Sequence, residues 1–119
     1  MPHLACAHCT RRLTTEIELT EAARGDVPGQ PYLPRGAYVS SWEGGFVVNC
    51  DDIVGAVRHP DQARSAGCCG PTGLDGPNLV CSGCGREVGT EESDCWKPHL
   101  VVTRPGATSL IVSAHERSA

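Results

Sequence analysis

The sequence predicts a mainly β protein with little helix, built from small antiparallel sheets. The 119 residues suit a single domain. The 14 glycines and 9 prolines divide the chain into short elements, which excludes long helices, helical bundles and coiled coils. Between these breaks lie short segments that alternate apolar and polar residues, as half-buried strands do. Two Cys-x-x-Cys motifs lie far apart in the sequence, and they suggest how so small a β protein is held together.

The first half of the chain predicts one strand, a loop and a hairpin. Residues 13–19 alternate apolar and polar side chains and predict a half-buried strand. Residues 20–36 contain three prolines and three glycines and predict a loop. Residues 37–42 and 46–49 predict two strands around Glu43-Gly44-Gly45, which is a hairpin signal.

The second half predicts a long connection followed by more strands. Residues 51–57 fit either a capped helical turn or a strand, and Gly55 weakens both alternatives. Residues 59–77 form a long connection that contains the adjacent pair Cys68-Cys69. Structureless loops longer than about 12–15 residues are usually functional or disordered. Leu79-Val80 leads into the second cysteine motif, and the last strands of the main body are expected at residues 86–90 and 99–103.

The predicted domain ends near Pro105-Gly106. Residues 1–105 are expected to form a single metal-stabilised β domain, and residues 106–119 either a C-terminal tail or an added edge strand around 110–112. The longest apolar runs span three residues, as at 46–48, whereas a membrane-spanning helix needs about 20. The sequence therefore predicts no contact with a membrane.

The charge excludes one class of partner, and the first residues suggest a compartment. The formal net charge is −4, and the ten Lys and Arg residues are spread along the chain, with only Arg11-Arg12 adjacent. Nucleic-acid binding needs clustered positive charge, so no nucleic-acid partner is expected. Residues 1–6 lack the basic region and apolar stretch that begin a secretory signal. We therefore expect a cytoplasmic protein whose thiols stay reduced.

The two Cys-x-x-Cys motifs predict a structural zinc site. Each motif can direct two thiolates at one ion, and two motifs supply the four tetrahedral ligands of a closed site. Thiolate ligands favour Zn²⁺ or an iron–sulfur cluster over hard cations. Gly85 directly follows the second motif and can adopt a positive φ, while Thr10 takes the matching place after the first. His3 and His8 flank the first motif and are alternative ligands. The predicted zinc ligands are Cys6, Cys9, Cys81 and Cys84.

The remaining cysteines and histidines allow three interpretations. They form a second metal site, they are small buried side chains, or Cys68 and Cys69 are a redox pair with Cys95 as the resolving thiol. A catalytic zinc with an open coordination position, held by His59, Cys95 and His99, is a further alternative. Little positive charge lies near the cysteine pair to activate it. The residues of this second candidate site are His59, Cys68, Cys69, Cys95 and His99.

The layout resembles the zinc-binding β-tent domains, which include Yippee proteins, cereblon-type ligand-binding domains and methionine sulfoxide reductase B. Two cysteine motifs from distant segments share one zinc ion there, and the stretch Cys81-Ser82-Gly83-Cys84-Gly85-Arg86-Glu87-Val88-Gly89 is similar to the second motif and its following strand. The resemblance implies a β-tent-like fold, with a zinc ribbon as the alternative. No Arg-Tyr-Cys stretch follows the second motif, so the resemblance does not extend to reductase activity.

These observations favour a non-catalytic, zinc-stabilised binding module over an enzyme. Its ligand, a small molecule or a protein, is not specified by the sequence. Trp96 is the candidate for an aromatic pocket wall, with packing in the core or beside the zinc ion as the alternative. A thiol redox enzyme or sensor that uses Cys68, Cys69 and Cys95 is the second hypothesis.

Overall fold

The computed structural model describes residues 2–21, 25–41, 43–67 and 70–112. It is a β structure, and the described residues contain no α-helix, only two short 3₁₀ helices, η1 (Cys50–Asp52) and η2 (Gln62–Ser65). The prediction of a mainly β fold with little helix is confirmed. The strands are β1 (His3–Cys6), β2 (Glu18–Leu19), β3 (Ala37–Ser40), β4 (Phe46–Val48), β5 (Ala56–Arg58), β6 (Leu79–Cys81), β7 (Glu87–Glu92), β8 (Leu100–Thr103) and β9 (Thr108–Ile111).

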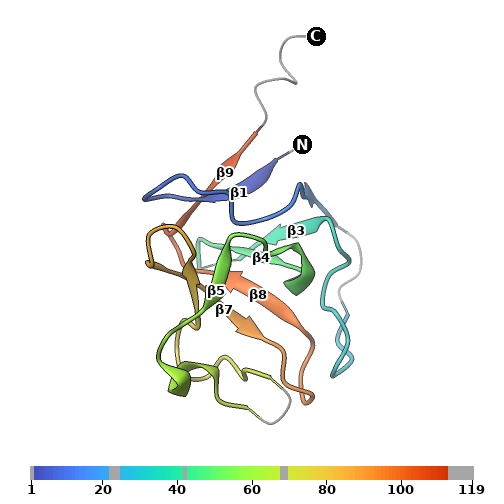
Figure 1. Ribbon diagram of the computed structural model, residues 1–119. Coiled ribbons are helices and arrows are strands. Elements are labelled where there is room, and N and C mark those ends of the chain that lie inside the picture. Colours follow the sequence, from blue (N-terminus) through green and yellow to red (C-terminus); the bar gives the residue numbers. More distant parts are fainter. Residues whose placement is uncertain (1, 22–24, 42, 68–69, 113–119) are drawn as a thin grey trace.

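The strands form two sheets. The larger sheet has the order β2-β3-β4-β8-β7-β6-β5, and its pairs are antiparallel except β2 with β3. The smaller sheet is the antiparallel pair β1 and β9. Figure 1 shows the β1–β9 pair at one end of the molecule and the loop that carries η2 at the opposite end. The two cysteine motifs therefore leave different sheets, since one follows β1 and the other follows β6.

The predicted hairpin is confirmed as β3 and β4, with Tyr38 paired to Val48 and Ser40 to Phe46. Ser41 N–H donates to the Gly45 carbonyl at 2.8 Å and closes the turn. Position 42 lies outside the described residues. Residues 51–57 contain both predicted alternatives, because η1 is followed closely by β5.

The strand predicted over residues 13–19 is mostly wrong. Only Glu18–Leu19 form a strand, and Thr14 makes a single bridge to Ile53. Leu13 and Ile17 are buried, as the alternation suggests. The backbone hydrogen bonds of this segment do not follow a strand ladder, because Leu13 N–H and Thr14 N–H both donate to the same acceptor, the Leu4 carbonyl. The alternation of apolar and polar residues over 13–19 therefore reflects which side chains of a bent segment are buried. It does not reflect a continuous strand.

Strands of both sheets contribute side chains to one buried core, which includes two of the motif cysteines. Cys6 and Cys81 are 2% and 1% exposed and belong to this core. The buried carboxylate of Asp52 also fixes two loops, because it accepts from the Thr15 hydroxyl at 2.9 Å and from Gly36 N–H at 2.7 Å. The other core side chains are Leu4, Leu13, Ile17, Tyr38, Val48, Leu79, Val88 and Val101.

Part of the segment beyond residue 105 is ordered against the amino-terminal strand. In β9, Leu110 pairs with Leu4 and Thr108 pairs with Cys6. The domain limits of 1–105 and 106–119 stay a prediction, and residues 113–119 lie outside the described part. No helix in the described ranges is long and apolar enough to cross a membrane.

Candidate metal centre

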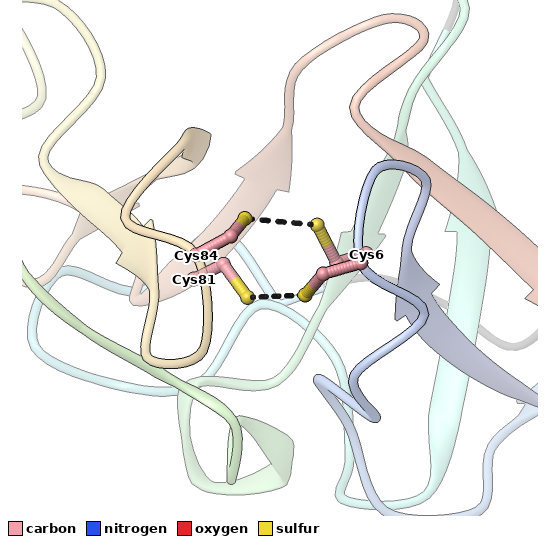
Figure 2. Close-up of side chains that lie close together, drawn as sticks. Cys6, Cys81 and Cys84 are labelled. Atoms are coloured by element: carbon pink, nitrogen blue, oxygen red, sulfur yellow. Dashed lines mark hydrogen bonds between the residues drawn. The ribbon is translucent and has the colours of Figure 1, made fainter.

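The four motif thiols come together in one cluster. Their sulfur atoms all lie within 4.8 Å of one another, although the two motifs are separated by more than 70 residues. Figure 2 shows the side chains of Cys81 and Cys84 facing Cys6 of the first motif across a small gap. Cys6 Sγ lies 3.7 Å from Cys84 Sγ, and Cys9 Sγ lies 3.5 Å from Cys81 Sγ. The arrangement is compatible with one bound metal ion.

The two motifs fold into the same turn. We name residues 6–11 the first knuckle and residues 81–86 the second knuckle. In each, the first cysteine begins the turn at the end of a strand, and its carbonyl and N–H groups bond to residues four and five positions later. Two short strands, β1 and β6, thus present their cysteines in equivalent positions. The matching bonds are Thr10 N to Cys6 O (2.9 Å), Gly85 N to Cys81 O (2.8 Å), Cys6 N to Arg11 O (2.8 Å) and Cys81 N to Arg86 O (2.8 Å).

The environment of the cluster shifts the pKa values of Cys81 and Cys9 in opposite directions. Burial raises the pKa of Cys81, but N–H groups of Cys84 and Gly83 and the neighbouring thiols outweigh it and lower that pKa to about 7. Gly83 N–H lies 3.4 Å from the sulfur. At Cys9 the Arg11 N–H favours the thiolate, but the thiol of Cys81, burial and the other two thiols raise the pKa to about 11. The cluster therefore favours the thiolate form at Cys81 and disfavours it at Cys9.

The two knuckles are also joined at Gly55, a residue that sequence reasoning did not assign to the site. Ser82 N–H and its hydroxyl both donate to the Gly55 carbonyl, at 2.9 and 2.8 Å. On its other side, Gly55 N–H donates to the Leu13 carbonyl at 3.2 Å. A Cβ at Gly55 would lie 1.9 Å from the Arg12 carbonyl oxygen, so only glycine fits. Gly55 thus links the chain after the first knuckle to the second knuckle.

A cleft of about 480 Å³ opens beside the cluster. We name it the arginine cleft, since Arg86 and Arg104 line it. The sequence analysis missed it, because neither arginine lies in a recognisable motif and their approach depends on the fold. The other lining residues are Cys6, Ala7, His8, Glu87, Pro105, Gly106 and Ala107.

The second candidate site is not assembled within the described residues. The thiol cluster is the only described group of three or more histidine, cysteine or acidic side chains whose ligand atoms lie close enough for one ion. Both ring nitrogens of His59 have partners, since Nε2 lies 3.1 Å from Glu87 Oε2 and Nδ1 accepts from Asp61 N–H. The Cys95 side chain is exposed. Cys68 and Cys69 lie outside the described residues, so their redox role stays a prediction.

Other aromatic and histidine candidates lie away from the positions expected of them. Trp96 is 81% exposed, so the alternative of core packing is wrong, and it lines neither the arginine cleft nor the second cavity, of about 230 Å³, beside the first knuckle. His3 and His8 are not among the clustered ligands. His8 instead contributes to the rim of the arginine cleft.

Similarity to known proteins assigns no family. Comparisons with protein-family models, with curated proteins and with solved structures gave no match. The resemblance to β-tent domains therefore stays an expectation based on the two cysteine motifs, and function must be argued from the thiol cluster and the cleft beside it.

Proposed function

We propose that Cys6, Cys9, Cys81 and Cys84 bind one zinc ion, and that this ion has a structural role in a non-catalytic binding module. The spacing of the sulfurs is the observation that carries the proposal. A zinc–sulfur distance of about 2.3 Å in a tetrahedron requires sulfurs about 3.8 Å apart. The contacts of 3.7 and 3.5 Å between the knuckles fit this geometry.

The same spacing disfavours other metal centres. In an iron–sulfur cluster, the cysteine sulfurs surround several iron and sulfide atoms and must lie farther apart than around a single ion. A ligand set of thiols only is also a poor match for Mg²⁺ or Ca²⁺, which prefer oxygen. One mononuclear ion that accepts four thiolates is the best fit, and zinc is the common one.

The closed ligand set supports a structural role. A catalytic zinc keeps a coordination position for water or substrate, whereas four protein thiolates leave none. Two of the four ligands, Cys6 and Cys81, are also almost completely buried. The ion would join the β1–β9 sheet to the seven-stranded sheet, because each sheet carries one knuckle. Reduced thiols are needed throughout, which fits a cytoplasmic location.

Elemental analysis of the purified protein tests the proposal. We expect one zinc ion per chain, and Co²⁺ substitution should give the visible absorption of a tetrahedral thiolate complex. Cys81→Ser should lose the ion, while Cys95→Ser, which removes an exposed thiol outside the cluster, should retain it. A folded protein that contains no metal, or one that contains iron instead of zinc, would contradict the proposal.

A further inference from the structure

The arginine cleft has three walls that the fold brings together from distant parts of the chain. They are residues 6–8 of the first knuckle, residues 86–87 at the start of β7, and the 104–107 turn between β8 and β9. Backbone hydrogen bonds fix these walls. Ala7 N–H donates to the Ala107 carbonyl at 3.0 Å, and Arg104 N–H donates to the Val88 carbonyl at 2.9 Å. The cleft is therefore a built feature of the fold and not a gap between loose loops.

The charged groups at the cleft leave positive charge uncompensated. Glu87 is the one carboxylate in the lining. Its Oε1 lies 2.9 Å from Arg104 Nη1, and its Oε2 lies 3.1 Å from both Arg64 Nη1 and His59 Nε2. A single carboxylate is thus shared by two guanidinium groups and an imidazole. The Arg86 side chain is exposed and has no hydrogen bond or ion pair to any described residue.

The metal centre adds negative charge, but at the back of the cleft. Four thiolates around one Zn²⁺ carry a formal charge of about −2. Only Cys6 of the four lines the cleft, and it is 2% exposed. The Arg104 side chain is 50% exposed, so the guanidinium groups lie on the solvent side of the thiolates. A ligand that enters from solvent therefore meets positive charge first.

The cleft has room for a ligand because small residues form much of its lining. Ala7, Gly106 and Ala107 contribute almost no side chain, and nothing lies within 4 Å of the place where a Cβ of Gly106 would be. The volume of about 480 Å³ is in the range of about 300–1,000 Å³ that small-molecule sites occupy. Guanidinium groups bind carboxylate and phosphate in two-pronged, charge-assisted pairs.

We propose that the arginine cleft binds a small molecule through an oxyanion, a phosphate or carboxylate group, held by Arg86 and Arg104. The inference rests on the proposed binding-module function and supplies the chemical class of its ligand. Glu87 keeps Arg104 in place in the absence of the ligand. His8 at the rim carries a ring N–H that can donate a further hydrogen bond to the ligand.

The test uses zinc-loaded protein whose metal content has been measured, so that failure of this proposal is separate from failure of the metal site. Inorganic phosphate and succinate are titrated separately at constant ionic strength, and backbone amide shifts are followed by NMR. We expect saturable shifts at Ala7, His8, Gly106 and Ala107. The probe that binds more tightly identifies whether phosphate or carboxylate is the preferred group.

Three variants sharpen the test. Arg86→Gln should weaken probe binding about tenfold, because it removes a charge-assisted pair. Arg35→Gln is the matched control, since it removes the same charge from an exposed loop position outside the cleft and should change nothing. Glu87→Gln should strengthen binding severalfold by removing the competing carboxylate. Shifts spread over the whole surface, equal loss in both arginine variants, or binding of a diamine with none of the anions would overturn the proposal.

Discussion

Thr10 and Gly85 have the same left-handed backbone conformation, with φ of 67° and 79°, at equivalent positions of the two knuckles. A glycine adopts this conformation without strain, whereas a residue with a branched Cβ does so at a cost. The first knuckle therefore reaches the geometry of the second despite an unfavourable residue. The need to place Cys9 beside Cys81 explains why the strain persists.

Substitutions at these two positions should change the free energy of unfolding in opposite directions. Gly85→Ala should lower the free energy of unfolding by about 1–2 kcal/mol, the cost of a left-handed conformation, because an added Cβ meets no atom within 4 Å and adds no clash. Thr10→Gly should raise it by about 0.5 kcal/mol, since relief of strain is offset by the greater freedom of glycine in the unfolded chain. Urea denaturation at fixed free zinc measures both. Changes of the same sign would contradict the equivalence of the knuckles.

Removal of the metal should unfold the protein. Zinc binding in small domains contributes about 10–16 kcal/mol, comparable to or larger than the net stability of about 5–15 kcal/mol of a typical domain. The few large apolar side chains of this core leave little to compensate. Chelation at neutral pH should abolish the β circular dichroism, and added zinc should restore it. The Cys95→Ser protein should behave identically, and a chelated protein with native strand content would exclude a structural role for the ion.

Acidification should release the ion, because thiols must lose their protons to bind it. The pKa of Cys81 is lowered from its ordinary 9.0 to about 7, so its ionisation stabilises the fold above pH 9 and this contribution disappears as the pH falls through 7. At Cys9 the pKa is raised to about 11, so a bound metal must displace that proton throughout the neutral range. Zinc affinity, measured against a chromophoric chelator, should fall more than about tenfold per pH unit below pH 7. A flat profile would contradict thiolate ligation.

Gly55→Ala should separate the two knuckles. The new Cβ would meet the Arg12 carbonyl oxygen at 1.9 Å and its carbon at 2.9 Å, and backbone atoms cannot move aside locally. We expect a loss of about 2–3 kcal/mol of stability and weaker zinc binding, as for other overpacked sites. Gly29→Ala is the control, because its Cβ would meet nothing within 4 Å and only the positive φ of 82° is strained. Equal, small effects of the two changes would show that the Gly55 contact does not matter.

Sequence patterns predicted the features that depend on neighbouring residues. The β3–β4 hairpin follows from strand-forming residues around adjacent glycines. The thiol cluster was predicted because two Cys-x-x-Cys motifs have few other ways to satisfy four thiolates. The alternation over residues 13–19 was a weaker guide, since burial of Leu13 and Ile17 does not require strand pairing.

Features that depend on distant backbone segments could not be predicted. Gly55 carries no sequence signal for its contact with Arg12, because only the folded chain brings these two residues together. The arginine cleft likewise needs the turn after β8 to reach the first knuckle. Thr10 has a positive φ, which threonine rarely adopts. A search for glycine after a Cys-x-x-Cys motif therefore identifies only the second knuckle, where Gly85 follows Cys84.

The pairing of β1 with β9 has a consequence for the order of events during translation. β9 is the only strand paired with β1 in the described chain, so β1, which is synthesised about 100 residues before β9, must wait for residues 108–111 to emerge from the ribosome. Until then, Leu4 and Cys6 have no ladder partner from β9, and the first knuckle lacks the hydrogen bond from Ala7 N–H to the Ala107 carbonyl. A nascent chain released before residue 108 would lack that edge, which would leave its amino-terminal segment open to proteases and to pairing with other chains.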